Sequence, residues 1–202
     1  MSFSNIIRDS VRGSEIFDVR DYFLARRIVL LTDVVTPESM AELILDIMYL
    51  ESEGDYREIT LLINSPGGDY SSGIALFDLL KSTHSPIRTV CIGTAASMGA
   101  ILFLAGDKRE MLPHTRLMIH DPSVSNSTLA NLKPHEIERT MSELDKVRRE
   151  LVDIVSQTTG KSAKVVEKMT REDCFFNAQE ALDFGLATGV AELTSWEEKT
   201  YE

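Results

Sequence analysis

The feature that most constrains this sequence is a regular alternation of short apolar runs with segments of helical periodicity. Four apolar runs predict strands, at residues 28–31, 59–63, 89–92 and 117–119. Thr36 and Pro37 favour a helix start after the first run, because they supply a capping hydroxyl and a first-turn proline. A second helical pattern covers residues 70–81, and Gly93 is expected to end the third strand. This order predicts βαβ units, a mostly parallel sheet and an α/β fold.

Turn residues stand at the predicted ends of three of these strands. Gly67 and Gly68 follow the second strand, and His120 directly follows the fourth. A helix is expected to begin near Ser97, soon after the third strand. Functional residues of open α/β sheets gather where strands end and helices begin. A functional site is therefore expected at this edge of the sheet.

Ser97 lies in the segment GTAASMGA, whose small side chains allow a tight turn from strand to helix. The first N–H groups of a helix have no partner within it, so they can hold a developing oxyanion. The amides of Gly68 and Met98 are the two candidates for such donors. Both motifs also occur without any catalytic role. A serine at this place commonly caps a helix, and a glycine pair commonly forms a tight turn.

His120 can act as general base and acid for a serine, provided that an acidic residue orients it. Asp173 is one candidate for this role. It precedes the apolar pair Phe175 and Phe176, and an acid that enters a buried strand needs a partner. Asp121 is the rival, although adjacent strand residues point to opposite faces. Sequence spacing leaves both acids open.

A long amphipathic helix is predicted from Pro134 to about Gln157. Its apolar residues form one stripe, which can pack on the chain's own core or against a second copy of the chain. Further elements are expected at 162–169 (helix), around Asp173 (extended), at 178–184 (helix) and near Val190 (strand).

Composition narrows the class of protein. The chain has 202 residues and a net charge of −11, which suits a single domain and repels the phosphates of nucleic acids. No apolar run is long enough to span a membrane. Cys91 and Cys174 lie in apolar surroundings, which favours small core residues over a disulfide or a metal site and indicates a cytoplasmic protein. The other histidines are expected at the surface: His84, His114 and His135.

Several linked segments resemble the proteolytic subunit of the ATP-dependent Clp protease, the ClpP family of serine peptidases. The resemblance extends from about residue 12 to about residue 193. The segments that carry it are RGSEIFDVRDYFLARRIVLLT, EITLLINSPGGDYSSGIALFD, TVCIGTAASMGAILFLAG, RLMIHDPS and EDCFFNAQEALDFGLA. Their joint occurrence is far more specific than any one of them.

The resemblance implies a role for each matched residue. Ser97 would be the nucleophile, His120 the general base and acid, and Asp173 the orienting acid. The backbone amides of Gly68 and Met98 would form the oxyanion hole. The family has no metal or cofactor of its own.

The resemblance also implies an architecture. The family fold is a spiral of ββα units, shared with the crotonase superfamily, from which a strand and a helix protrude as a handle. Residues 1–202 would form one such domain, with an axial segment at 1–17 and the handle at about 121–160. In this family the handles join two heptameric rings into a chamber, and a hexameric ATPase unfoldase feeds it unfolded polypeptides.

The sequence departs from the family pattern in three places. A glycine pair common after the histidine segment is missing from residues 123–131. Glu172 precedes Asp173 where an arginine is common, with Arg171 one residue earlier. Four residues match the positions that form the family's apolar ATPase-docking pocket: Leu62, Ser82, Val90 and Ile92. A serine is a poor wall for an apolar pocket.

Two alternative functions accompany the prediction of a serine endopeptidase. The altered handle is consistent with a weakly active or structural subunit of a mixed ring. A crotonase-like acyl-CoA enzyme would share the fold and the two-amide oxyanion hole, but it would not need a serine and a histidine together. The presence of both Ser97 and His120 therefore favours the peptidase.

Overall fold

The computed structural model describes residues 5–10, 13–124 and 129–191. Its main feature is a seven-stranded sheet in which β3, β4, β5, β6 and β9 lie in that order, while β7 pairs with β5 and β8 with β7. All pairs are parallel except β7 with β8, which confirms the predicted α/β class. The strands are β3 (Ile28–Leu31), β4 (Ile59–Ser65), β5 (Ile87–Ala96), β6 (Lys108–Met111), β7 (Arg116–Ile119), β8 (Cys174–Phe176) and β9 (Gly189–Val190).

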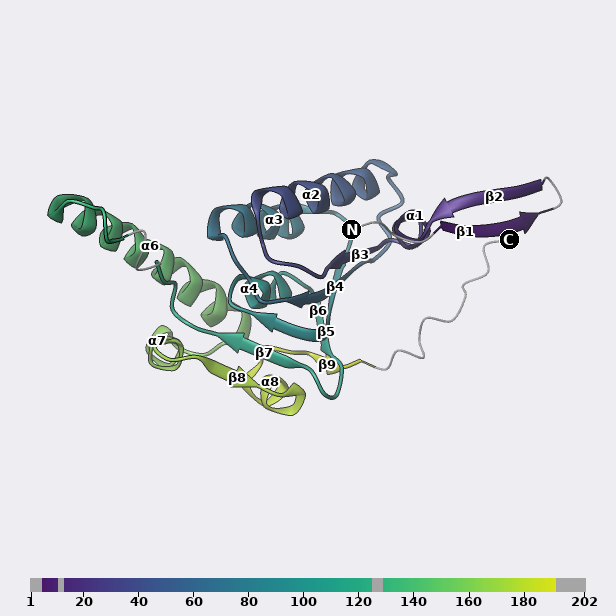
Figure 1. Cartoon of the computed structure of the whole chain (residues 1–202). Helices are drawn as coiled ribbons and strands as arrows, with labels where there is room; N and C mark the ends of the chain where they lie inside the picture. The colour runs from purple at the N-terminus through teal and green to yellow at the C-terminus, as the bar shows by residue number, and fades with distance from the viewer. Residues whose placement is uncertain (1–4, 11–12, 125–128, 192–202) are drawn as a thin grey trace.

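The helices α2 and α3 lie together on one face of the sheet, and α4 lies between them and the strands (Figure 1). Every residue of α4 is buried, so this short helix forms the centre of the main core. The helices are α1 (Val19–Leu24), α2 (Pro37–Ser52), α3 (Tyr70–Ser82), α4 (Met98–Leu104), α6 (Pro134–Thr159), α7 (Ala163–Thr170) and α8 (Ala178–Phe184). Thr36 caps α2 as predicted, since its hydroxyl accepts a hydrogen bond from the amide of Ser39 at 3.1 Å.

The two faces of the sheet are covered unequally. Leu61 and Ile63 of β4 belong to the main core beneath the helices. Leu62 points to the opposite face, as strand alternation requires, and packs with Val90 and Ala191 in a second, much smaller cluster. Among the described residues, this cluster is far smaller than the main core beneath the helices.

The prediction that Gly93 ends the third strand is wrong, because β5 continues through it to Ala96. The pairing of β4 with β5 shifts register between Ile63 and Ser65. At this shift the side chain of Asn64 accepts a hydrogen bond from the amide of Thr94 at 3.0 Å. A Cβ added at Gly93 would lie 2.3 Å from the Asn64 Oδ1 atom, so the glycine leaves room for this side chain and the strand continues.

Three parts of the fold were not predicted from periodicity. The first is β6, which carries Lys108, Arg109 and Glu110 in four residues, and these charges obscure its apolar pattern. The second is the short helix α1. The third is an antiparallel hairpin of β1 (Asn5–Ser10) and β2 (Gly13–Asp18), which occupies the proposed axial segment at 1–17. Residues 1–4 and 11–12 of that segment lie outside the described residues.

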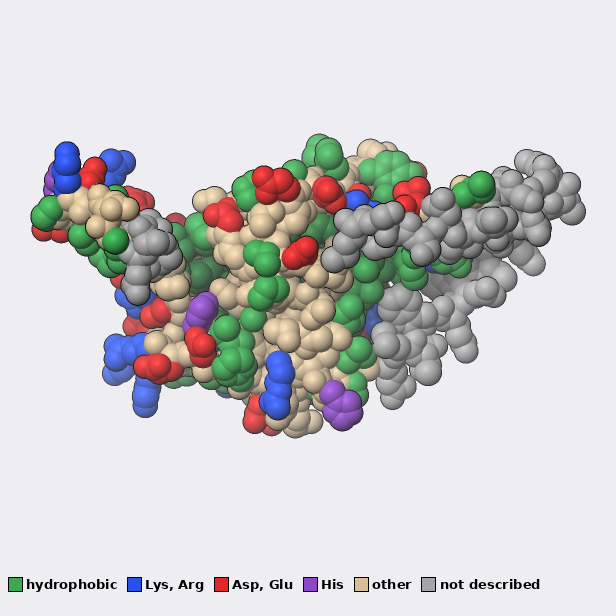
Figure 2. Space-filling model, in the orientation of Figure 1, with side chains coloured by type: hydrophobic (Ala, Val, Ile, Leu, Met, Phe, Trp, Pro, Cys, Tyr) green, Lys and Arg blue, Asp and Glu red, His purple; other side chains and the backbone are tan. Residues whose placement is uncertain are grey.

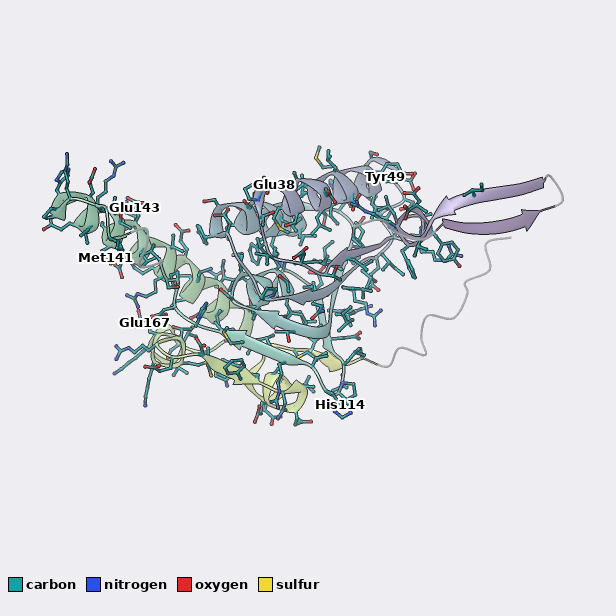
Figure 3. All side chains as sticks on the ribbon, viewed as in Figure 1. Glu38, Tyr49, His114, Met141, Glu143 and Glu167 are labelled. Atoms are coloured by element: carbon teal, nitrogen blue, oxygen red, sulfur yellow. The ribbon has the colours of Figure 1, made fainter. Side chains whose placement is uncertain are left out.

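The long helix predicted after Pro134 is confirmed as α6. Its inner end packs on the core through Val152 and Val155, while its outer half projects from the body (Figures 1 and 3). Met141 and Glu143 lie on this outer half, and both are exposed. The inner apolar stripe thus packs on the chain's own core. The strand expected before the helix is absent from 121–124 and 129–133, and residues 125–128 lie outside the described residues.

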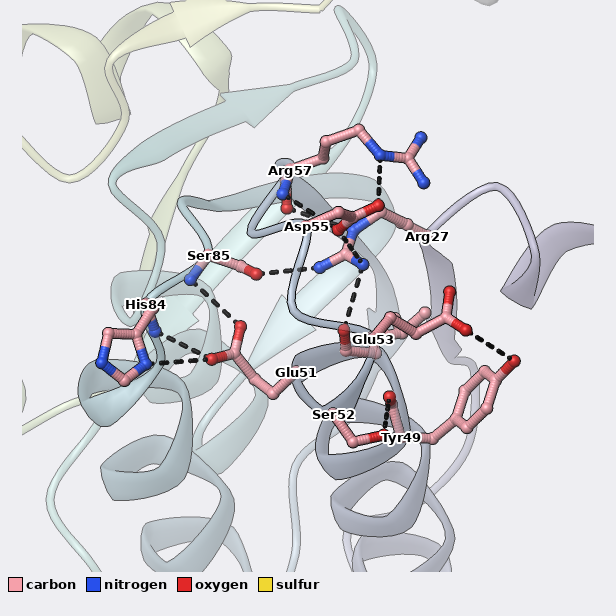
Figure 4. A network of polar contacts seen from close by, with 10 residues as sticks. Arg27, Tyr49, Glu51, Ser52, Glu53, Asp55, Arg57, His84 and Ser85 are labelled. Carbon is pink, nitrogen blue, oxygen red and sulfur yellow. Dashed lines mark hydrogen bonds and ion pairs between the residues drawn. The ribbon is translucent and has the colours of Figure 1, made fainter. Parts of the chain in front are cut away.

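A buried arginine ties the loops at one end of the sheet together (Figure 4). The side chain of Arg27 is 1% exposed and pairs with Asp55 at 2.9 Å. It donates hydrogen bonds to the carbonyl oxygens of Leu50 and Arg57 and to the hydroxyl of Ser85. Glu51 extends the network by accepting from the amides of two residues in the neighbouring loop, His84 and Ser85.

Charge is distributed unevenly over the surface. The helix α2 contains four acidic residues and no basic ones, and red side chains gather over it in Figure 2. Basic side chains gather instead at the outer end of α6 and beside α7. Of the helices in the described part of the chain, none is long and apolar enough to cross a membrane. His84, His114 and His135 are exposed, as predicted. Of the two cysteines predicted to lie in the core, Cys91 is buried and Cys174 is only partly buried.

Candidate active site

Ser97 is the single residue between the end of β5 and the start of α4. Its φ is positive, with φ 52° and ψ −121°, a conformation that costs free energy in a residue with a side chain. The turn is held because the amide of Ser97 donates to the carbonyl oxygen of Met118 in β7, at 2.9 Å. The small neighbours identified in the sequence therefore serve a constrained turn. The serine hydroxyl makes no helix-capping bond.

His120 lies between Ser97 and Asp173 and contacts both. Its Nε2 atom is 2.9 Å from the Ser97 Oγ atom, and its Nδ1 atom is 3.0 Å from the Asp173 Oδ1 atom. A carboxylate only accepts hydrogen bonds, so Nδ1–H is the donor to Asp173. In the neutral imidazole, Nε2 is then free to accept the proton of the Ser97 hydroxyl. Ser97, His120 and Asp173 form a continuous hydrogen-bonded line, which we call the Ser97 line.

The register of the antiparallel pair of β7 and β8 explains why Asp173 meets the histidine. Ile119 of β7 stands opposite Cys174 of β8. One step further along the same register, His120 stands opposite Asp173. Side chains of directly opposed residues lie on the same face, which brings the imidazole and the carboxylate together.

Asp121, the rival acid, is engaged elsewhere. Its carboxylate accepts a hydrogen bond from the hydroxyl of Thr170, and its amide donates to the carbonyl oxygen of the same residue. The reasoning that favoured Asp173 as a buried acid is wrong in one respect, because its side chain is 59% exposed. It precedes an edge strand, so water reaches the carboxylate. His120 is more enclosed, with 28% of its side chain exposed.

Two glycines shape the turn that faces Ser97. Gly67 and Gly68 have φ values of 89° and 148°, which side chains rarely adopt. A Cβ added at Gly67 would lie 2.8 Å from the amide nitrogen of Met98, and one at Gly68 would lie 2.3 Å from the carbonyl oxygen of Val35. The turn therefore packs tightly between Val35 and the start of α4, and no residue with a side chain fits either position.

The amides of Gly68 and Met98 are available as donors. In the described part of the chain, neither N–H group has an acceptor. Val35 donates to the carbonyl oxygen of Gly67 and accepts from the amide of Asp69, which leaves the N–H of Gly68 turned away from Val35. Both candidate donors thus lie at one end of the Ser97 line.

A groove with a volume of about 490 Å³ runs past these residues. One wall comes from the sheet edge and the start of α4, and the other from the inner half of α6. The first wall includes Gly68, Tyr70, Ser97, Met98 and His120, and the second Leu144, Val147, Leu151 and Val155. Apart from Arg148, the α6 wall is apolar, and the groove is polar at the serine, which suits an extended chain whose reacting group is polar.

Tyr70 is a groove residue that the sequence did not indicate. Its hydroxyl donates to the carboxylate of Glu150 on α6, eighty positions away, and thereby links the two walls. Burial and the neighbouring Glu150 raise the pKa of Tyr70, so the hydroxyl stays protonated. No local motif marks such a pair. The apolar stripe of α6 was the one available signal for the second wall.

The residues matched to an ATPase-docking pocket are only partly brought together. Leu62 and Val90 belong to the small second cluster, and the partly buried Ile92 packs against it. Ser82 is the last residue of α3 and is exposed. Its hydroxyl donates to the carbonyl oxygen of Leu79.

A family comparison agrees with this geometry. The model of the Clp protease family matches residues 11–194, which is most of the chain. The chain therefore belongs to the Clp protease family. Its parallel-dominated α/β structure is consistent with the fold of that family.

Proposed function

We propose that this member of the Clp protease family is a serine endopeptidase whose nucleophile is Ser97. The observation that carries the proposal is the line from Ser97 through His120 to Asp173, with contacts of 2.9 and 3.0 Å. Distances of this size allow direct proton transfer between serine and imidazole. The assignment of roles follows from the geometry of these groups, because their order along the chain differs between unrelated serine peptidases.

The first half of the reaction forms an acyl-enzyme. Ser97 Oγ attacks the scissile carbonyl carbon while His120 Nε2 takes the hydroxyl proton. The carbonyl oxygen becomes an oxyanion, and the amides of Gly68 and Met98 stabilise it. The intermediate collapses as the C–N bond breaks, and His120 passes its proton to the leaving amine. Asp173 holds the imidazole in the required tautomer and stabilises its charged form.

The second half regenerates the enzyme. A water molecule takes the place of the departed amine and gives a proton to His120 as its oxygen attacks the acyl carbon. The second oxyanion occupies the same two-amide site. Collapse releases the new carboxyl end of the peptide, and the proton returns from His120 to Ser97.

The proposed setting is a closed chamber of two stacked heptameric rings in the cytoplasm. A hexameric ATPase unfoldase would supply unfolded polypeptides, and it would dock near the cluster of Leu62, Val90 and Ile92. The protruding outer half of α6, with the exposed Met141, supports a contact between copies. Enclosure suits a reactive serine in a groove that selects little beyond an extended, partly apolar chain.

The test is labelling of the assembled protein with a fluorophosphonate, which reacts with activated serines. Wild type is expected to be labelled and Ser97→Ala is not, and peptide hydrolysis should follow the label. Sedimentation of the same samples reports the assembly state. An assembled wild type that neither labels nor cleaves an unfolded protein in the presence of an unfoldase would disprove the proposed activity.

A weakly active or structural subunit of a mixed ring is the second candidate. The observation that favours it is the exposure of Asp173, whose carboxylate has water access in the isolated chain. A neighbouring subunit that covered Asp173 would strengthen its bond to His120 by excluding water. In that case labelling should be weak for the chain alone and should increase when a second Clp peptidase subunit is added.

A further inference from the structure

Ser65, the last residue of β4, has a hydroxyl that both donates and accepts inside the protein. The residue is 1% exposed. Its Oγ atom donates to the carbonyl oxygen of Asp33 at 2.6 Å and accepts from the amide of Gly67 at 3.1 Å. The hydroxyl therefore ties the glycine turn to the loop that follows β3. Without it, the buried N–H of Gly67 and the partly buried C=O of Asp33 would each lose a partner.

The same residue supports the start of α4. A Cβ added at Gly99 would lie 3.0 Å from the Ser65 carbonyl oxygen and 3.5 Å from its hydroxyl oxygen. Gly99 is thus in close contact with Ser65, and it directly follows Met98. Ser65 also pairs with Ala95 of β5, two residues before Ser97. The serine nucleophile and both amide donors are therefore connected to Ser65 by one or two contacts.

The orientation of Gly68 depends on this turn. Val35 donates to the carbonyl oxygen of Gly67 and accepts from the amide of Asp69, and these two bonds direct the amide of Gly68 away from Val35. Because Gly67 and Gly68 have wide conformational freedom, such a turn needs anchors to hold one arrangement. The hydroxyl of Ser65 is the side-chain anchor of that turn, since it holds the amide of Gly67.

We infer that Ser65 is a positioning residue for the oxyanion hole, holding the amides of Gly68 and Met98 at a fixed separation. The inference rests on the proposed function, because it concerns donors to an oxyanion. Donors of this kind contribute most when they are fixed before the reaction. Ser65 touches no reacting atom, so it acts only through the turn and through α4.

The test is Ser65→Ala in the assembled protein, with steady-state hydrolysis of a short fluorogenic peptide. We expect kcat to fall about 10- to 100-fold while KM changes less than about threefold, because donor misplacement affects the transition state more than substrate binding. The affinity for a peptide boronate, whose tetrahedral adduct mimics the intermediate, should fall by the same factor as kcat. Binding of an uncleaved peptide, measured in a Ser97→Ala background, should not change.

Ser156→Ala is the matched control. The hydroxyl of Ser156 on α6 is also buried, but among the described residues it has no hydrogen-bond partner. Its loss should leave kcat and boronate affinity within about twofold of wild type. Ser65→Cys covers the case in which Ser65→Ala fails to assemble. A thiol keeps weaker forms of both bonds, so an intermediate kcat is expected.

The outcomes separate the two proposals. If wild type reacts with fluorophosphonate and Ser65→Ala retains wild-type kcat and boronate affinity, the positioning role is overturned and the peptidase stands. Equal losses in kcat and in binding of the uncleaved peptide would also overturn it, because they would indicate a general distortion of the groove. An unreactive wild type overturns the proposed function and this inference with it.

Discussion

This fold contains two networks of polar side chains, and they differ in how many hydrogen-bond donors they leave without an acceptor. The Arg27 network joins loops at one end of the sheet, and its guanidinium group is enclosed by four acceptors (Figure 4). The Ser97 line lies at the other end of the strands and joins three elements through single contacts. Beside it, among the described residues, two amides have no acceptor. The Arg27 network directs most of its donors to acceptors within the protein, and the Ser97 line leaves two donors for a ligand.

The presence of donors without acceptors distinguishes a functional polar cluster from a structural one in the same protein. A buried charge such as Arg27 is tolerated only when acceptors surround it, so its contribution is to stability. The residues of the Ser97 line are only partly buried, and they include a serine in a costly backbone conformation. Changes in the first network should therefore reduce stability, and changes in the second should reduce activity.

The largest expected effect is that of Ser97→Ala on hydrolysis. We expect peptide cleavage to fall by at least about 10³-fold, because the nucleophile is lost while binding remains. The melting temperature should stay close to that of wild type, since the hydroxyl makes no capping bond in α4. Calorimetry and a fluorogenic peptide assay on one preparation measure both. A large fall in melting temperature would contradict the division between the two networks.

Asp173→Asn should have the next largest effect, a fall in kcat of about 10²-fold, because the amide favours the wrong histidine tautomer. The exposure of Asp173 argues against a greater loss, since water can partly replace the carboxylate. Asp121→Asn is the matched control, because that carboxylate accepts from Thr170 and does not contact His120. Comparable losses from both variants would show that the β7–β8 register does not determine which acid acts.

Arg27→Met tests the other network through stability. The variant leaves the carbonyl oxygen of Leu50 without this donor and removes one of the two arginines that pair with Asp55, which should lower the free energy of unfolding by about 3 kcal/mol. For a chain of this size that loss corresponds to a fall of roughly 6–12 °C in melting temperature. The kcat of the folded fraction should remain that of wild type. A selective loss of kcat would instead connect Arg27 to the site.

The smallest expected effect is the pH dependence of Glu51→Gln. Burial alone would raise the pKa of Glu51, but hydrogen bonds from Ser85 and His84 outweigh it and hold the pKa below its ordinary value of 4.5. A lowered carboxyl pKa stabilises the folded state above the unfolded pKa, and this contribution is lost as pH falls. Urea unfolding should therefore show the variant about 1 kcal/mol less stable near pH 7. The difference should shrink at pH values well below 4.5, and a constant difference would contradict the assignment.

Local patterns predicted most of the elements but not all of their ends. Thr36, Pro37 and the apolar spacing after them were sufficient for α2, because capping and amphipathic packing are short-range effects. The prediction at Gly93 was wrong because the effect of a glycine inside a strand depends on what fills the space beside it. Here the side chain of Asn64 fills that space, and the strand continues. β6 was missed because the charged residues of its four positions obscure any apolar alternation.

Local sequence patterns predicted the βαβ order, the strand ends that hold Gly68, Ser97 and His120, and the two candidate acids. These follow from periodicity and turn chemistry, which act within a few residues. Spacing left Asp173 and Asp121 both open, and the family resemblance pointed to Asp173. Which acid contacts His120 depends on the register of β7 against β8 across more than fifty positions, and the tertiary structure brings Asp173 to the imidazole. It also revealed the contacts of Ser65 and Tyr70. Ser65 bonds to Asp33 in the loop after β3, and Tyr70 bonds to Glu150 on α6. Contacts of that range are set by packing, and no local pattern encodes them.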